Sequence, residues 1–506
     1  MAEIVLTTFN ARFSHPSLGL RCLMANLGPL RDSARLVEFD LEKRPEEALE
    51  TLLKHSPRII GCAVHVWNHT LTRHLASLLK QVRPEVILVL GGPEVSHLPA
   101  DHPLVTLADY RILGAGELAF ADLCRAILAG NPPASRDRIA PSPDPAALAL
   151  PHAEYDATDL AHRYLYVESS RGCPYRCSFC LSANDLQVRR FPLEPLLAAL
   201  ENLIARGGRH FKFVDRTFNL GERHAGVILD FFLNHLAATP DLFLHFEMMP
   251  DHLPEGLKRR LSAFPAGSLQ LEVGVQSFQP AVLAAIDRHQ EQERVTENLR
   301  WLRTHTHAHL HTDLIVGLPG ESPEPFAAGF DRLLALDPHE IQVGILKRLP
   351  GTPLALDTPA DFRFDPEPPY ELLENAQFDF MTLRRFKRLS RYWDLVGNSG
   401  RFRTTLQLAF ENRSPFATFL AFSDWLHATT GQTHQIALPR LIQLVETGLR
   451  EVTGIDPDRW SQALEVDRRS MHNTAKKAAT HAPPRQMRHL PSTTQISTPH
   501  HEGEPP

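Results

Sequence analysis

The sequence contains little cysteine, no long apolar run and no large excess of charge of one sign. Only six of its 506 residues are cysteines, and Cys22, Cys62 and Cys124 lie far apart, which argues against a disulfide framework. No apolar run approaches membrane-spanning length, and the N-terminus lacks a signal-peptide pattern. The formal net charge of -6 gives no general affinity for polyanions. We therefore expect a reduced, cytoplasmic protein that does not associate with membranes.

The chain is too long for one hydrophobic core, so we expect several domains in an α/β protein. Changes in pattern and composition predict five segments: a Rossmann-like domain over residues 1–135, a linker over 136–163, a barrel over 164–365, a mainly helical domain over 366–472 and a disordered tail over 473–506. The linker is rich in Pro and Ala, and the tail is rich in Pro, Thr, Ser and His.

Three of the cysteines are grouped in the stretch Arg-Gly-Cys-Pro-Tyr-Arg-Cys-Ser-Phe-Cys, residues 171–180. Cys173, Cys177 and Cys180 follow a C-x3-C-x2-C pattern, and Gly172 and Pro174 favour an irregular loop around them. Three thiolates suit an iron–sulfur cluster with one iron left open, whereas structural zinc takes four protein ligands. A zinc site or three unrelated cysteines are the alternatives.

This cysteine stretch resembles the signature loop of radical S-adenosylmethionine (SAM) enzymes. The resemblance implies that Cys173, Cys177 and Cys180 hold a [4Fe–4S] cluster whose open iron binds SAM. It also implies cleavage of SAM to a 5′-deoxyadenosyl radical, with Phe179 against the adenine and an external electron donor such as flavodoxin or ferredoxin.

Before residue 130, short apolar strands alternate with helical patterns, which predicts a doubly wound parallel sheet. We expect strands at residues 4–9, 35–40, 59–66, 86–91 and 110–113. Ligands of such sheets bind at the carboxyl ends of the strands. The candidate binding residues at these ends are Thr8, Asn10 and His15; His65, Trp67 and Asn68; Gly91, Gly92, Pro93 and Glu94; and Gly114, Gly116 and Glu117.

In front of the cysteine loop, the Gly-Gly-Pro-Glu and Gly-x-Gly-Glu segments resemble the cobalamin-binding domain of cobalamin-dependent radical SAM enzymes. The Asp-x-His-x-x-Gly loop, whose histidine ligates cobalt in many cobalamin carriers, is absent; His15, followed by Gly19, is the nearest candidate. Cobalt without a protein lower ligand is one alternative. A degenerate sheet that has lost cobalamin is another.

After residue 164, six further strand–helix units resemble the partial (β/α)6 TIM-like barrel of radical SAM enzymes. We expect strands at residues 164–169, 210–215, 242–247, 268–275, 309–316 and 340–346. Asp215 and Asn219 at the second strand end are candidates for polar parts of SAM, and Arg216 for a carboxylate or phosphate. By resemblance, Glu272 and Gln276 contact the SAM ribose and methionine.

The remaining chain is predicted to be helical from residue 370 to about 452, and it resembles an uncharacterised domain that follows the barrel in one subgroup of these enzymes. A basic run, Arg384 to Arg391, is interpreted as a solvated helix face, with phosphate or nucleic-acid contact as the alternative. His305, His307, His309 and His311 alternate, which predicts a polar strand face rather than a metal site.

Three functions fit this organisation. The first is a cobalamin-dependent radical SAM methyltransferase acting on an unactivated carbon of an unidentified substrate. The second is a cobalamin-independent radical SAM enzyme, such as a tRNA-modifying enzyme or a methylthiotransferase. A methylthiotransferase needs a second cluster, but Cys22, Cys62 and Cys124 fall within helical or strand patterns. The third is a sensor without catalysis, which the intact cysteine loop disfavours.

Overall fold

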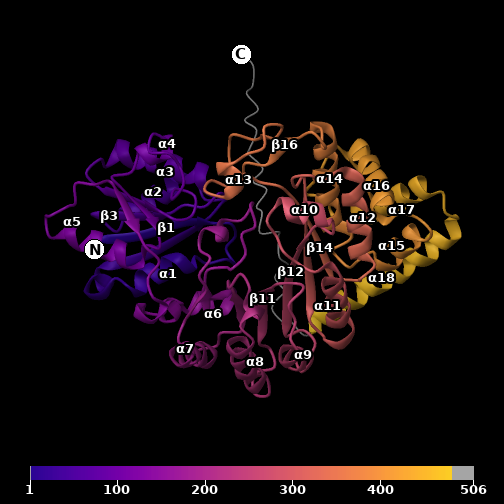
Figure 1. Cartoon of the computed structure of the whole chain (residues 1–506), viewed down its shortest axis with the longest axis horizontal. Helices are drawn as coiled ribbons and strands as arrows, with labels where there is room; N and C mark the ends of the chain where they lie inside the picture. Colours follow the sequence, from indigo (N-terminus) through magenta and orange to yellow (C-terminus); the bar gives the residue numbers. More distant parts are fainter. Residues whose placement is uncertain (1, 481–506) are drawn as a thin grey trace, which may run out of the picture.

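The computed structural model describes residues 2–480, with side chains described to residue 471. In Figure 1 the chain runs from an indigo N-terminal domain, through a magenta central barrel, to yellow C-terminal helices. No helix within the described residues is long and apolar enough to cross a membrane.

The first domain is a parallel sheet covered by helices on both faces. Its strand order is β2-β1-β3-β4-β5-β6, with β1 (Ile4–Asn10), β2 (Ala34–Asp40), β3 (Ile59–Ala63), β4 (Ile87–Gly91), β5 (Tyr110–Gly114) and β6 (Asp137–Ala140). One face packs against α1 (Leu18–Ala25), η1 (Gly28–Ser33) and α5 (Gly116–Leu128). The other face packs against α2 (Pro45–Leu53), α3 (His69–Val82) and α4 (Pro103–Thr106). The five expected strands are confirmed.

The segment expected to be a linker is instead built into the structure. Strand β6 adds a sixth strand that pairs in parallel with β5. It is followed by η2 (Pro145–Ala147), η3 (Pro151–Glu154) and α6 (Ala157–His162). A capping box between Asp156 and Asp159 starts α6. Composition alone missed these elements because they are short and separated by prolines.

The barrel is an open, six-stranded parallel sheet of order β14-β13-β12-β11-β10-β7. The strands are β7 (Leu165–Val167), β10 (His210–Phe213), β11 (Phe243–Met248), β12 (Leu269–Gln276), β13 (His309–Val316) and β14 (Glu340–Ile345). The helices are α7 (Leu193–Ala205), α8 (Glu222–Leu236), α9 (Glu255–Ser262), α10 (Pro280–Ala285), α11 (Gln292–His305) and α12 (Pro323–Leu334). Shorter elements are β8 (Ser170–Arg171), η4 (Leu181–Asn184), β9 (Arg189–Arg190), η5 (Phe218–Leu220) and α13 (Pro353–Leu356). All six predicted strands are confirmed.

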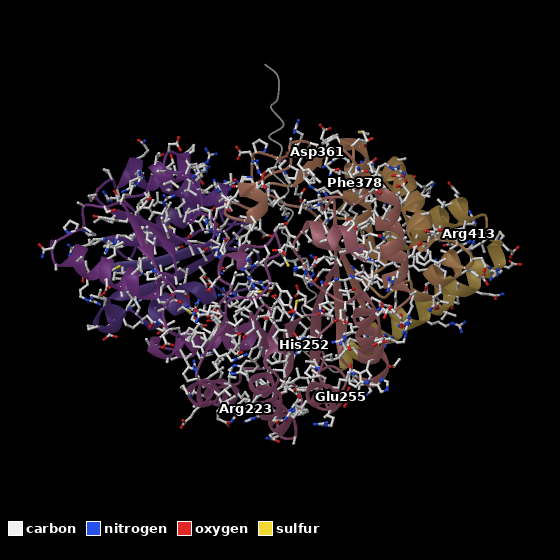
Figure 2. The ribbon with its side chains drawn as sticks, viewed as in Figure 1. Arg223, His252, Glu255, Asp361, Phe378 and Arg413 are labelled. Carbon is white, nitrogen blue, oxygen red and sulfur yellow. The ribbon has the colours of Figure 1, made fainter. Side chains whose placement is uncertain are left out.

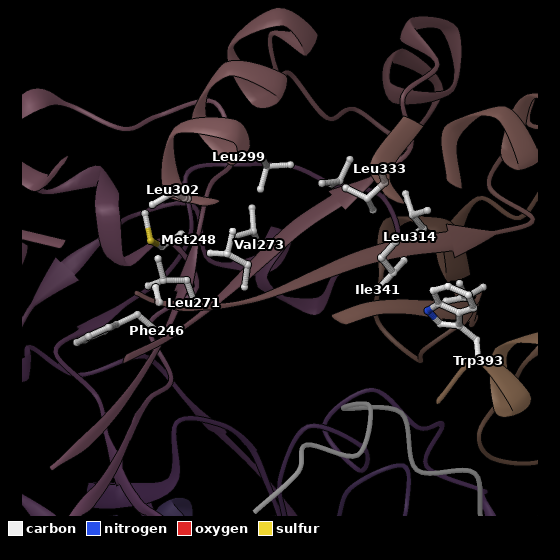
Figure 3. Close-up of a cluster of buried hydrophobic side chains, with 14 of the residues drawn as sticks. Phe246, Met248, Leu271, Val273, Leu299, Leu302, Leu314, Leu333, Ile341 and Trp393 are labelled. Carbon is white, nitrogen blue, oxygen red and sulfur yellow. The ribbon is translucent and has the colours of Figure 1, made fainter. Parts of the chain in front are cut away.

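Apolar side chains of the strands and the outer helices form the barrel core. Figure 3 shows Leu271 and Val273 of β12 beside Leu299 and Leu302 of α11, and Trp393 of the C-terminal region near Ile341 of β14. These side chains are almost fully buried. Their burial is the main driving force that holds helices on the outside of the sheet.

The C-terminal region begins with strands and continues as helices. The pair β15 (Arg363–Phe364) and β16 (Leu372–Glu374) precedes α14 (Phe380–Val396), α15 (Arg403–Phe410), α16 (Pro415–Thr430), α17 (Leu438–Thr453) and α18 (Pro457–Thr480). Helix formation therefore starts about ten residues later than expected. Phe378 (labelled in Figure 2) is fully buried where this region joins the barrel. Helix α18 continues past residue 473, and residues 481–506 of the predicted tail lie outside the described part.

Candidate functional site

The cysteine loop lies at the carboxyl end of β7, the first barrel strand. Cys173, Cys177 and Cys180 all line one cavity of about 360 Å³, which we call the cysteine cavity. Gly172 has a φ of +88°, and a Cβ at this position would collide with the backbone oxygen of Gln187. Glycine is therefore needed to turn the chain into the loop. The amide of Cys173 donates to the carbonyl of Asp185 at 2.8 Å, which closes the loop.

Three thiols that line one cavity are a donor set that suits an iron–sulfur cluster with one open iron. In the described chain, no three His, Cys, Asp or Glu side chains are arranged around one ion. A cubane cluster binds each thiolate to a different iron, so its ligands lie farther apart than those of zinc. Burial raises the pKa of Cys173 and of Cys177. The Arg288 guanidinium lies 3.6 Å from Cys177 Sγ, where it favours the thiolate.

Other predicted residues reach the same cavity from the strand ends. Phe179, Glu272 and Gln276 line it, together with Arg216. Gln276 ends β12 with a φ of +68°, a left-handed conformation that is uncommon for a residue with a side chain. The structure therefore brings three of the five predicted SAM-contacting residues to the cysteines.

Asp215 and Asn219, the other two, make hydrogen bonds to neighbouring protein groups. Asp215 is buried and accepts hydrogen bonds from the amide and hydroxyl of Ser169, at 2.9 and 2.7 Å. Asn219 is buried and exchanges two hydrogen bonds with the backbone of Met249, at 2.8 and 2.9 Å. Neither is among the residues lining the cysteine cavity. They hold the loops at the ends of β7, β10 and β11 in place.

Lys212 and Arg288 line the cavity but were missed in the sequence. Lys212 occupies an inward position of β10, with its Nζ 3.6 Å from Glu272 Oε2. A lysine in the middle of an apolar strand was the available signal. Arg288 follows α10 and donates to the carbonyl of Gly274 at 2.5 Å. The sequence around Arg288 does not indicate that this side chain lines a cavity, because its position beside the cysteines depends on the tertiary fold.

The cavity wall carries buried charges of both signs. Burial raises the pKa of Glu247 to about 7 and lowers that of Lys347 to about 8. His245 Nε2 lies 3.0 Å from Glu272 Oε2, inside the barrel. Such clusters of perturbed groups are characteristic of functional sites.

A second cavity of about 620 Å³ lies between the carboxyl edge of the first-domain sheet and the barrel; we call it the interdomain cavity. Predicted residues Gly91, Gly92, Gly114, Gly116 and Glu117 line it. At Gly92, with a φ of +105°, a Cβ would lie 2.5 Å from the carbonyl oxygen of Val64. A Cβ on Gly91 would meet nothing within 4 Å. The wall at Gly91 is therefore open to a ligand.

His65 and Pro93 also line the interdomain cavity, whereas other predicted residues of this edge make hydrogen bonds within the protein. Asn10 donates to Glu38 at 2.9 Å, and Trp67 Nε1 donates to the carbonyl of Phe9 at 3.2 Å. Asn68 donates to Thr8 Oγ1 at 2.9 Å. Glu94 lies 2.9 Å from His69 and accepts a 2.5 Å hydrogen bond from Tyr370, which joins the first domain to the C-terminal region.

The two cavities share a wall. Cys180 and Ser182 line the cysteine cavity, and Leu181 and Asn184 line the interdomain cavity. Arg171, just before the cysteines, forms a 2.5 Å ion pair with Glu117 of the first domain. Ligands in the two cavities would therefore lie on opposite sides of a few residues.

The other sequence features have structural partners. In the basic run, Arg385, Lys387, Arg388 and Arg391 pair with acidic groups, which argues against a free nucleic-acid patch. His309 and His311 both contact Glu340. Cys62 and Cys124 pack in the cores on opposite faces of the first sheet. Those two thiols cannot share a second cluster.

Three family models match separate parts of the chain. A B12 binding domain matches residues 4–124, the radical SAM superfamily matches residues 167–333, and a protein of unknown function (DUF4080) matches residues 361–485. The first two matches contain the interdomain-cavity glycines and the three cysteines, respectively.

Two curated relatives are 28% identical to the chain. One is 2-(S-pantetheinyl)-carbapenam-3-carboxylate methyltransferase of Streptantibioticus cattleyicolor, over 339 residues. The other is the cobalamin-dependent radical SAM methyltransferase TokK of Streptomyces tokunonensis, over 334 residues. Each match covers 59% of this chain and 48% of the relative, so the chain spans about half the length of these relatives.

Among solved structures, the cobalamin-dependent S-adenosylmethionine radical enzyme OxsB with aqua-cobalamin bound is similar in fold. The TM-score is 0.60 at 14% identity, and the match covers 95% of this chain and 84% of that chain. The likeness in fold extends over almost the whole chain.

Proposed function

We propose that this chain, parts of which match the B12 binding domain, the radical SAM superfamily and DUF4080, is a cobalamin-dependent radical SAM methyltransferase. The substrate carbon would be unactivated. When bound, SAM at a [4Fe–4S] cluster supplies the radical that removes a hydrogen atom, and cobalamin supplies the methyl group. The reactivity belongs to the cofactors, and the protein positions them.

The observation that carries the proposal is the pair of adjoining cavities. One contains three cysteines at the carboxyl end of the barrel, and the other has a glycine-lined wall at the edge of the first sheet. Residues from the segment 180–184 contribute to the walls of both. An enzyme that uses both cofactors on one substrate carbon needs this proximity.

In this proposal each cavity has named ligands. Cys173, Cys177 and Cys180 hold the cluster, Phe179 contacts the adenine of SAM, and Glu272 and Gln276 bind its polar groups. Gly91, Gly92, Gly114 and Gly116 line the corrinoid site, and Gly91, where a Cβ would meet nothing within 4 Å, lets the corrinoid approach the backbone. Lys347 lines the same cavity as the cysteines, and its ammonium group favours an anionic substrate group.

We also propose a cytoplasmic, reducing location and an external one-electron donor of the flavodoxin or ferredoxin type. Six free cysteines and a cluster site on one chain support a reducing compartment. A second cluster of the methylthiotransferase type is disfavoured, because Cys62 and Cys124 lie on opposite faces of the sheet.

The test is reconstitution. The chain is expressed without oxygen, supplied with iron, sulfide and hydroxocobalamin, desalted, and assayed for iron, cobalamin and release of 5′-deoxyadenosine. We expect one [4Fe–4S] cluster and near-stoichiometric cobalamin. The Cys177→Ala variant should lose the cluster and SAM cleavage while keeping cobalamin. A wild-type chain with a cluster but no retained cobalamin would contradict the proposal and direct the search to cobalamin-free radical chemistry.

A further inference from the structure

His65 lies just beyond the carboxyl end of β3 and lines the interdomain cavity. Its Nδ1 is buried, and within the described part of the chain it has no hydrogen-bond partner. A buried polar atom without a partner costs about 1–3 kcal/mol. His65 as a residue lines the interdomain cavity, and a half-turn of its ring would exchange Nδ1 with Cδ2, so a ligand in that cavity is the candidate partner.

The surroundings hold the imidazole ring in a fixed plane. The ring stacks on Trp67, with centroids 4.3 Å apart and an interplanar angle of 10°. Trp67 is anchored in turn by its hydrogen bond to the Phe9 carbonyl. The amide of His65 donates to Asn68 Oδ1 at 2.8 Å, which fixes the backbone. The side chain is therefore preorganised although its ring nitrogen is unsatisfied.

The same surroundings keep the ring neutral. Burial lowers the pKa of His65 to about 4, and nearby Glu94 raises it only in part. At neutral pH the imidazole therefore offers a free lone pair, which is the form that binds metals. A half-turn of the ring about the Cβ–Cγ bond keeps the plane set by Trp67 and exchanges the positions of the ring nitrogens with those of ring carbons.

His65 lies at the switch point of the first sheet. Strand β3 lies at the centre of the first sheet, beside β1, where the direction of strand succession reverses. This crevice is where open α/β sheets bind ligands. Leu181 and Asn184, next to the cysteine cavity, also line the interdomain cavity. A ligand in this cavity would therefore lie between the sheet edge that carries His65 and the segment that follows Cys180.

The other histidines near this edge are less suited. His15 was the nearest candidate in the sequence, but its Nδ1 lies 2.5 Å from the hydroxyl of Tyr166, and it does not line the cavity. His97 lines the cavity, but its ring is packed against the backbone of Gly351. His65 combines access to the cavity with an unpartnered nitrogen.

We propose that His65 is the lower axial ligand of cobalt, bound from the sheet side through an imidazole nitrogen lone pair. This inference rests on the proposed function, because it requires cobalamin in the interdomain cavity. A nitrogen donor on this face leaves the opposite face of cobalt free towards the barrel. It also stabilises Co(II) relative to four-coordinate Co(I), so it lowers the reduction potential of that couple.

The deciding experiment is electron paramagnetic resonance of the full chain loaded with cob(II)alamin. Protein is prepared with ordinary histidine and with ¹⁵N-histidine. An axial ¹⁴N splits each cobalt line into a triplet, and an axial ¹⁵N splits it into a doublet. We expect triplets that become doublets on labelling. Triplets that persist in labelled protein would identify the cofactor's own base as ligand, and unsplit lines would mean no nitrogen ligand; either result overturns the proposal.

Two variants complete the test. His65→Ala should retain cobalamin, lose the nitrogen splitting and show a Co(II)/Co(I) potential shifted to a less negative value. His97→Ala, a change at the same cavity, should keep the splitting. If His65→Ala no longer binds cobalamin, the labelled wild-type spectrum still decides. Wild-type protein that retains no cobalamin would refute the proposed function itself, whereas retained cobalamin without protein nitrogen refutes only the role of His65.

Discussion

Individual ionisable residues at the barrel strand ends are buried in environments that disfavour their charged forms. Glu321 is 2% exposed, and its Oε1 lies 2.6 Å from Ser277 Oγ. Lys347 lies just after β14 and lines the cysteine cavity. Sites that keep such groups for binding or catalysis commonly do so at a cost in stability. That cost can be measured through its pH dependence.

Glu321→Gln tests the cost of the buried carboxylate. Burial raises the pKa of Glu321 to about 7, so the folded chain holds a proton that the unfolded chain has lost between about pH 4.5 and 7. The stability of the wild type therefore falls as pH rises through this window. We expect Glu321→Gln to match the wild type at pH 4.5 and to exceed it by about 2 kcal/mol at pH 8.

Thermal unfolding of the cofactor-free chain at both pH values measures this difference. The control is Glu324→Gln, which changes an exposed carboxylate three residues away and should leave the profile unchanged. An equal gain at pH 4.5 and pH 8 would contradict ionisation of Glu321 as the cause.

Lys347→Met tests the buried ammonium group. Burial lowers the pKa of Lys347 to about 8, below the usual value near 10.4, so the folded chain loses this proton first as pH rises. Wild-type stability should therefore increase between about pH 8 and 10. At pH 7 we expect Lys347→Met to be more stable than the wild type, on the order of 1 kcal/mol after allowing for partial exposure.

The measurement is chemical denaturation at pH 7 and pH 9.5, where the advantage of Lys347→Met should shrink. Lys54→Met, at an exposed lysine, serves as the control. A gain that grows with pH would show that desolvation of Lys347 is not the dominant effect.

At the scale of elements, the carboxyl end of β4 combines two neighbouring glycines with different requirements. Gly92 needs a left-handed backbone and has the carbonyl of Val64 directly beside it. Gly91 has an ordinary backbone and faces open space. Gly92 is therefore required for the chain to fold, whereas Gly91 is expected to matter for ligand binding.

The pair Gly91→Ala and Gly92→Ala tests this separation. Gly92→Ala should destabilise the chain by more than about 1 kcal/mol, because alanine is strained at a positive φ. Gly91→Ala should leave the unfolding temperature within a degree or two and reduce cobalamin retention severalfold, because its methyl group enters the interdomain cavity. Unfolding curves and cobalamin absorbance after desalting give both quantities. Full cobalamin retention by Gly91→Ala would argue against binding at this wall.

At the scale of the whole molecule, the barrel and the C-terminal helices share one hydrophobic core. Trp393 of α14 lies 4.9 Å from both Phe330 of α12 and Phe419 of α16, measured between ring centroids. Ser390 of α14 also donates to the carbonyl of Val343 in β14, at 2.6 Å. The C-terminal region is therefore part of the barrel core and is not a separate appended domain. The two should unfold as one unit.

Trp393→Ala tests this shared core. Removing a 3% exposed tryptophan should cost about 3–5 kcal/mol. Circular dichroism and fluorescence should still follow one coincident transition at lower denaturant. Phe380→Ala is the matched control, since Phe380 begins the same helix and is 45% exposed. Two separate transitions, with only one affected by Trp393→Ala, would mean that the barrel folds independently.

Local pattern was enough to predict much of this molecule. Strand positions follow from runs of apolar residues, and the cysteine spacing is visible within eight residues. The order of the domains follows from these patterns along the chain, and the family models bear it out. Strand β6 was not predicted, because a strand of four residues in a proline-rich segment is too short to show a periodic pattern.

Side-chain direction and distant contacts were decided only by the tertiary structure. Asp215 and Asn219 look like ligand residues in the sequence, yet both turn to neighbouring backbone. Arg288 and Lys212 meet the cysteine cavity only because strands far apart in sequence lie side by side. The same holds for His65, which faces the interdomain cavity, and His15, which packs on Tyr166. Periodicity is a property of neighbouring residues, whereas a binding site depends on how separate segments pack, so the sequence determined the elements and packing determined the site.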